Sequence, residues 1–282
     1  MSQVKVITDS NAFFADEGLV DDLSIQVVPL TIQIGQHSYQ EGVNLSSELC
    51  LRRLSQDPVS VSVSAPTVAE YAAILSRIGQ TNDRAVCIHV SSALNDVAEV
   101  ARRAANGLLG RQRIVVLDTA TTSAGLGLIV EAAARAAAAG EPAAEVERIV
   151  RGMIPHVYAL FFSDTLQYLE AWGRLGPAQA MLGTMLGLKP LATMEDGDLL
   201  PIEKVRNYAH AVEKLHDFIA EFSRIDQLYV LQHGFEMEAA QLVERLELIH
   251  PTRQFPVIGY PPSLAVHLGP KALGVIVYEG TP

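Results

Sequence analysis

Cysteine is scarce in this 282-residue chain, which contains only Cys50 and Cys87. Two cysteines cannot form the disulfide network that stabilises small secreted domains, and Cys87 lies in an apolar run where a small buried side chain is expected. The eight histidines are scattered, with no pair at three or four residues on one helix and no cysteine pair beside them. The sequence therefore predicts no metal site.

Positive charge is also scarce. The chain has 21 lysines and arginines but 32 acidic residues, which gives a net charge of −11. Nucleic-acid binding requires a concentrated basic face, so we expect no nucleic-acid partner. Long apolar runs are missing as well, since Glu131 and Arg135 interrupt the alanine-rich stretch after Gly125. The alternating pattern at Met1–Ser10 is typical of a strand, not of an export signal. We expect a cytoplasmic protein with no membrane span.

Complete catalytic signatures are absent from the sequence. It contains no G-x-x-x-x-G-K, no G-x-G-x-x-G after a strand, no G-x-S-x-G and no H-E-x-x-H. We therefore predict a protein that is not an enzyme, with no catalytic residues and no cofactor. One alternative stays open, a small-molecule enzyme that uses Asp9, Asp118 and His267 as acid and base groups.

The first half of the chain alternates short apolar runs, small polar clusters and helical segments, which is typical of a parallel sheet with crossover helices. The predicted strands are Val4–Thr8, Ile25–Ile34, Ala85–Val90 and Ile114–Leu117. Three of them lead directly into small polar residues. Ligands bind beyond the carboxyl ends of strands in open α/β sheets, so this edge is the candidate site. Helical spacing predicts helices at 97–108, 124–139 and 143–154.

The order of elements changes after Pro155, which cannot continue a helix. The patterns then predict a hairpin turn at Glu195-Asp196-Gly197-Asp198, together with strands at 157–162, 228–231, 257–260 and 275–278 and helices at 177–186, 208–222 and 239–249. We predict an α/β protein with two domains, residues 1–155 and 156–282. The first has a mostly parallel sheet with flanking helices, the second is α+β, and the ligand cleft lies between them.

Six short segments stand in the order and at the spacing of the bacterial DegV family. They are Ile7-Thr8-Asp9-Ser10, Val28-Pro29-Leu30, 166–175, Leu188-Lys189-Pro190-Leu191, Lys204-Val205-Arg206 and His267-Leu268-Gly269-Pro270. The chain resembles this family over nearly its whole length. The resemblance implies a lipid-binding protein that holds a long-chain fatty acid and presents its carboxylate to a separate fatty acid kinase subunit. A regulatory binding module for a lipid without a carboxylate is the remaining alternative.

The resemblance also implies the ligand-binding residues. The family's Thr-Ser-x-Pro loop matches Val63-Ser64-Ala65-Pro66, and its Ser-Ser-x-Leu-Ser-Gly-Thr loop matches Ser91–Val97. Helix N-termini at such loops orient backbone N–H groups toward a carboxylate. The implied ligand-binding residues are Ser64, Ser92, Asn95, Asp96, Arg174 and His267.

Each of these residues also has a purely structural interpretation. Ser64 could form a turn or cap a helix before Pro66, and Asn95 could cap a helix. Arg174 could pair with Glu170, and His267 could be a hydrogen-bonded core histidine. Val63 and Asp96 depart from the family pattern, since Val63 lacks a hydroxyl and the charge of Asp96 either stabilises its helix or competes with an anionic ligand. These departures predict weaker carboxylate binding than is usual in the family, or a neutral head group.

Overall fold

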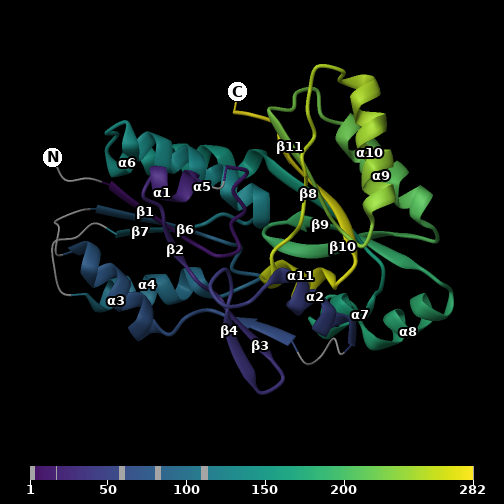
Figure 1. The fold of residues 1–282 in the computed structure, drawn as a ribbon, viewed down its shortest axis with the longest axis horizontal. Coiled ribbons are helices and arrows are strands. Elements are labelled where there is room, and N and C mark those ends of the chain that lie inside the picture. Colours follow the sequence, from purple (N-terminus) through teal and green to yellow (C-terminus); the bar gives the residue numbers. More distant parts are fainter. Residues whose placement is uncertain (1–3, 17, 57–60, 80–83, 109–113, 282) are drawn as a thin grey trace.

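The computed structural model describes residues 4–16, 18–56, 61–79, 84–108 and 114–281. These residues form three sheets. In Figure 1 the first half of the chain, in purple to teal, lies beside the second half, in green to yellow. The structure confirms the predicted fold class, a parallel α/β sheet with flanking helices followed by a sheet-and-helix region.

The first sheet is parallel throughout and has the strand order β2-β1-β6-β7. Its strands are β1 (Val4–Asp9), β2 (Gln26–Val28), β6 (Arg84–His89) and β7 (Ile114–Asp118). Helices cover both faces, with the pair α3 (Val68–Gly79) and α4 (Val97–Gly107) on one side and α1 (Leu19–Asp22), α5 (Ser123–Ala138) and α6 (Ala143–Met153) on the other (Figure 1). The polar residues that follow β1, β6 and β7 therefore meet at one edge, as predicted.

The prediction of one strand at Ile25–Ile34 is wrong. The chain leaves the parallel sheet at Pro29, which has no N–H to donate to a strand ladder. It then forms β3 (Thr31–Ile34), which pairs antiparallel with β4 (His37–Gln40) and β5 (Val61–Ser64) in a small separate sheet. Helix α2 (Ser47–Gln56) follows β4. The sequence patterns do not predict α2, α3, β4 or β5.

The second half is built on a sheet with the order β10-β9-β8-β13-β11-β12, antiparallel except for the pairing of β11 with β12. Its strands are β8 (Val157–Ser163), β9 (Lys189–Glu195), β10 (Asp198–Val205), β11 (Gln227–His233), β12 (Val257–Ile258) and β13 (Ala272–Tyr278). Helices α9 (Tyr208–Ala220) and α10 (Glu236–Ile249) pack on this sheet. Three shorter helices are α7 (Gln167–Ala171), α8 (Pro177–Met185) and α11 (Pro262–Leu268). No helix in the described ranges has the length and apolarity to cross a bilayer.

Two apolar clusters form the core. The smaller one lies within the second half and includes Phe162, Val212 and Leu242. The larger one contains Ile7 and Val86 from the first half together with residues of the second half such as Phe161 and Leu264. The predicted domain boundary at 155/156 falls within the 3-10 helix Ile154–His156. It stays a prediction, because the larger cluster joins residues from both sides of it.

Candidate ligand-binding site

Helix α11 lies at the junction of the two halves. All seven of its residues are buried, and it packs against α2 and β5 of the first half and against α7 and β8 of the second. Pro261 and Pro262 begin the helix, which ends at Gly269, where φ is +92°. The first turn of α11 lines a pocket, and its last turn carries His267.

His267 lies in the last turn of α11 and is 1% exposed. Its Nδ1 is 3.4 Å from Nη1 of Arg174, and its ring centroid is 4.4 Å from that of Trp172. Burial, followed by the positive charge of Arg174, lowers the pKa of His267 to about 3. The imidazole is therefore neutral at physiological pH. Among the described residues, Nε2 of His267 has no partner in hydrogen-bond geometry. The backbone of Leu94 favours the protonated ring, but this effect on the pKa is smaller than those of burial and Arg174.

Arg174 follows α7 and its side chain is only 7% exposed. Nε donates to Oδ1 of Asp198 at 2.7 Å and Nη2 donates to the carbonyl of Ala93 at 3.1 Å. The suggested ion pair with Glu170 is wrong, because Arg174 pairs with Asp198 across 24 positions of sequence. Burial alone would raise the pKa of Asp198, but hydrogen bonds from Arg174 and from the N–H of Leu199 lower it overall.

The turn after β6 supplies the first half's side of this cluster. Ser91 donates its hydroxyl hydrogen to the carbonyl of Gly197, and Oδ1 of Asn95 accepts the N–H of Val97 at 3.0 Å. Asn95 is buried, whereas Ser92 and Asp96 are exposed. The N-cap of α4 is Asp96, so Asn95 lies one residue before the cap and its Oδ1 binds the N–H of the first helical residue. The structure brings this turn, Arg174 and His267 together, and ligand binding by Ser92, Asn95 and Asp96 stays a prediction.

Ser64 has a different position from the one expected. It is an exposed residue at the end of strand β5, and its suggested role as a helix cap is wrong. Thr67 takes that role, since its Oγ1 accepts the N–H of Glu70 at 3.2 Å while the Glu70 carboxylate accepts the Thr67 N–H at 2.7 Å. Contact of Ser64 with a ligand stays a prediction, supported by the packing of β5 against α11.

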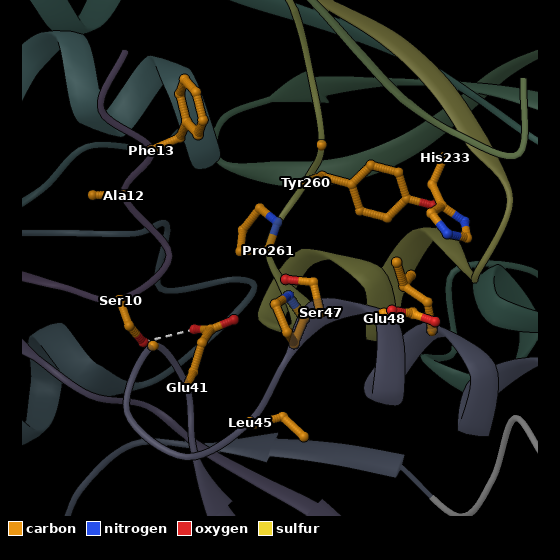
Figure 2. Close-up of a pocket in the computed structure, with 14 residues that line it drawn as sticks. Ser10, Ala12, Phe13, Glu41, Leu45, Ser47, Glu48, His233, Tyr260 and Pro261 are labelled. Carbon is orange, nitrogen blue, oxygen red and sulfur yellow. Dashed lines mark hydrogen bonds between the residues drawn. The ribbon is translucent and has the colours of Figure 1, made fainter. Parts of the chain in front are cut away.

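A pocket of about 420 Å³ lies at the first turn of α11. Figure 2 shows its walls, which come from the loop after β1, from α2 and from the segment before α11. Most of the lining is apolar, including Phe13, Leu45 and Tyr260, but Glu41 is among the lining residues and is only 3% exposed. The sequence analysis missed Glu41, because nothing near it in sequence indicates burial.

Glu41 ties the first half of the chain to α11. Its Oε2 accepts the hydroxyl hydrogen of Ser10 at 2.6 Å, drawn as a dashed line in Figure 2, and its Oε1 accepts the backbone N–H of Ser263 at 2.7 Å. Burial raises the pKa of Glu41 to about 7, even though both hydrogen bonds favour the carboxylate. The Glu41 side chain therefore titrates near physiological pH.

The polar residues that follow β1 form a buried network. Oδ2 of Asp9 is 2.9 Å from Nδ1 of His89, whose Nε2 is 2.6 Å from the Tyr71 hydroxyl. Asn11 donates to Oγ of Ser263 at 2.9 Å and accepts the N–H of Ser123 at 2.8 Å. His89 is completely buried. This network joins the parallel sheet, α5 and α11.

The alternative of an acid–base enzyme finds no support in these contacts. Asp118 accepts the backbone N–H groups of Ser92 and Ala120 at 3.1 and 2.8 Å. Among the described residues, no hydrogen bond or ion pair joins Asp9 or Asp118 to His267. The same part of the chain contains no group of three or more histidine, cysteine or acidic residues that could hold a metal ion.

Known proteins resemble this chain over its full length. The sequence model described as an uncharacterised protein of the DegV family matches residues 3–280. A DegV domain-containing protein of Streptomyces coelicolor is 31% identical over 281 residues, which cover 97% of this chain and 98% of the relative. The Protein DegV of Bacillus subtilis is 25% identical over 276 residues, 96% of this chain and 98% of that relative.

Solved structures show the same fold. A fatty acid binding DegV family protein of Streptococcus agalactiae has a TM-score of 0.88 at 20% identity, with all of both chains covered. A DegV family protein of Thermus thermophilus, whose structure concerns fatty acid binding, has a TM-score of 0.84 at 26% identity and covers 99% of this chain and 100% of its own. With the family's sequence model matched from residue 3 to residue 280, this chain belongs to the DegV family.

Proposed function

We propose that this protein binds a single long-chain fatty acid at the junction of its two halves, with the head group at the cluster of Arg174, His267 and the turn after β6. The observation that carries the proposal is the buried neutral imidazole of His267, whose Nε2 has no well-formed hydrogen bond in the described part of the chain. A buried polar atom of this kind is costly unless a ligand completes its hydrogen bonding. The T. thermophilus relative, described as binding fatty acid, supports the proposal.

The acyl tail supplies most of the affinity in this proposal. Each methylene removed from water contributes about 0.8 kcal/mol. A chain of sixteen carbons, the length chosen for the tests below, therefore binds tightly even when its head group contributes little. The mostly apolar pocket at the first turn of α11, with Phe13, Leu45 and Tyr260 in its lining, supports a place for such a tail at the junction.

The protein acts in this proposal as a carrier, not as an enzyme. A separate fatty acid kinase subunit would phosphorylate the carboxylate that the carrier presents, and the exchange would occur in the cytoplasm. The resemblance of the six sequence segments to the DegV family supports this step. It is tested by adding a purified bacterial fatty acid kinase subunit and ATP to the palmitate-loaded protein and measuring acyl phosphate.

Bound lipid is the direct test of the proposed function. Native mass spectrometry of gently purified protein should show the mass of the chain plus one acyl ligand, and solvent extraction should release a fatty acid. Protein stripped of lipid should take up palmitate in a titration. An empty protein that also fails to bind palmitate and oleate would contradict the proposal.

Replacing His267 with alanine should weaken palmitate binding. A hydrogen bond to a charged head group is worth about 1.5–3 kcal/mol, so the dissociation constant should rise roughly tenfold to a hundredfold. His37→Ala, at an exposed residue of β4, is the matched control and should bind as the parent does. Equal affinities of His267→Ala and the parent would assign His267 to structure alone.

A further inference from the structure

Glu41 places a carboxyl group in the wall of the pocket at the first turn of α11. The pocket has a volume of about 420 Å³ and a mostly apolar wall, yet the lining includes this side chain, which is only 3% exposed. Figure 2 shows its carboxyl group beside Ser10. An acyl tail in this pocket therefore lies next to a buried carboxyl group as well as apolar side chains.

No lysine or arginine belongs to the described lining of this pocket. The titratable groups around Glu41 are Asp9 after β1, Glu48 and Cys50 on α2, His233 at the end of β11 and Tyr260 before α11. Burial is the main cause that raises the pKa of Glu41 to about 7, and the negative charge of Asp9 adds to it. Glu41 is therefore partly protonated at neutral pH.

The hydrogen bonds that the structure gives Glu41 all use it as an acceptor. Its oxygens accept the hydroxyl hydrogen of Ser10 at 2.6 Å and the backbone N–H of Ser263 at 2.7 Å, and the Ser263 side chain also favours the carboxylate. Protonated Glu41 must donate a hydrogen. If either serine accepts it, that serine's own hydroxyl hydrogen loses its acceptor. Within the described contacts one buried donor is then left over, which is costly.

An oxygen atom on the acyl chain would accept this extra hydrogen, whereas a plain hydrocarbon chain cannot. Two substituents differ in a useful way. An oxo group can only accept a hydrogen bond, so it requires the protonated form of Glu41. A hydroxyl group can accept from protonated Glu41 and donate to ionised Glu41, so it fits both forms.

We propose that the ligand of this protein is a long-chain fatty acid that carries a hydroxyl or oxo group along its chain, and that Glu41 binds this group in the pocket at the first turn of α11. The inference rests on the proposed function, because it concerns the tail of the same fatty acid. The carboxylate keeps its place at the cluster of Arg174 and His267, and Glu41 becomes a residue that determines which tails are preferred.

The test compares palmitate with positional series of monohydroxypalmitates and mono-oxopalmitates at pH 6 and pH 8. All have sixteen carbons and a carboxylate, so the ratio of dissociation constants at each pH reports the substituent. At pH 6, where Glu41 is mostly protonated, the best isomer of each series should bind about twofold to tenfold more tightly than palmitate. At pH 8 the advantage of the oxo ligand should disappear and that of the hydroxy ligand should remain.

Glu41→Gln keeps an N–H donor at every pH, so its preference for the oxo ligand should be equal at pH 6 and pH 8. Glu244→Gln makes the same change at an exposed residue of α10 and should keep the pH dependence of the parent. If Glu41→Gln does not fold, the pH profile of the parent decides the question.

The inference is overturned if no substituted isomer binds more tightly than palmitate at pH 6. It is also overturned if the oxo preference of the parent is the same at both pH values, or if Glu41→Gln keeps the pH dependence of the parent. A protein that binds palmitate but prefers no substituted isomer retains the proposed function. A protein that binds none of these ligands contradicts the proposed function as well.

Discussion

Replacing Gly127 with alanine should destabilise the protein by at least about 3 kcal/mol, the upper end of the range typical for overpacked cores. Gly127 lies in α5, where the loop after β1 crosses the helix. A Cβ built at this position would be 1.7 Å from the backbone oxygen of Phe13 and 2.8 Å from its carbonyl carbon. Backbone atoms cannot rotate away as a side chain can, so either the helix or the loop must move.

The loop has little room to move. The N–H of Phe13 donates to the carbonyl of Ser123 at 3.2 Å, and Asn11 is hydrogen-bonded to Ser123 and Ser263. Phe13 also forms part of the pocket wall seen in Figure 2. We therefore expect Gly127→Ala to disturb the pocket and the anchoring of α11 as well as the free energy of unfolding.

Urea unfolding at equilibrium measures this effect, and Gly152→Ala is its matched control. Gly152 is an exposed residue near the end of α6, and a Cβ there would meet nothing within 4 Å. Alanine is favoured over glycine in helices by about 0.5–1 kcal/mol, so this variant should be slightly more stable than the parent. A Gly127→Ala variant as stable as the parent would show that the contact with Phe13 does not constrain the fold.

Replacing Glu41 with glutamine should change how stability depends on pH. Burial raises the pKa of Glu41 from 4.5 to about 7, so the folded state binds this proton more tightly than the unfolded state does. The contribution of Glu41 to stability is therefore full below pH 4.5, falls as the pH rises from 4.5 to 7, and is lost above pH 7. A shift of this size corresponds to a change on the order of 3 kcal/mol.

Glutamine cannot titrate, yet its side-chain oxygen can still accept the N–H of Ser263. The free energy of unfolding of Glu41→Gln, relative to the parent, should therefore rise by on the order of 3 kcal/mol between pH 4.5 and pH 8. The difference between the two proteins must be used, because the lowered pKa of His267 acts in the opposite direction below pH 6.5 in both.

Denaturant titrations at pH 4.5, 6 and 8 measure this difference. Glu48→Gln is the matched control, since it makes the same change at an exposed residue on the rim of the same pocket, and it should track the parent. If the difference in the free energy of unfolding between Glu41→Gln and the parent stays constant over this pH range, the pKa of Glu41 is not higher in the folded state than in the unfolded state, and the inference is wrong.

Local chemistry explains what the sequence predicted correctly. The hairpin at Asp196-Gly197 follows from two residues that tolerate positive φ, and the parallel strands follow from short apolar runs that end in polar residues. Helices α5 and α6 follow from apolar periodicity interrupted at Gly140 and Pro142. The resemblance to the DegV family indicated Arg174 and His267 as ligand-binding residues, and in the structure Nη1 of Arg174 is 3.4 Å from Nδ1 of His267.

Only the tertiary structure decided the partners and the environments of these groups. Helical spacing suggested Glu170, four residues from Arg174, as its ion-pair partner. Arg174 instead pairs with Asp198, because the hairpin of β9 and β10 reaches across the junction, where its Gly197 carbonyl accepts the hydroxyl hydrogen of Ser91. Glu41 is buried because α11, more than 200 residues later, closes over it, as the hydrogen bond from Ser263 shows. Backbone conformation and turn chemistry depend on a few neighbouring residues and can be seen in a sequence. Burial, desolvation and the choice of ion-pair partner depend on segments that meet only when the chain has folded.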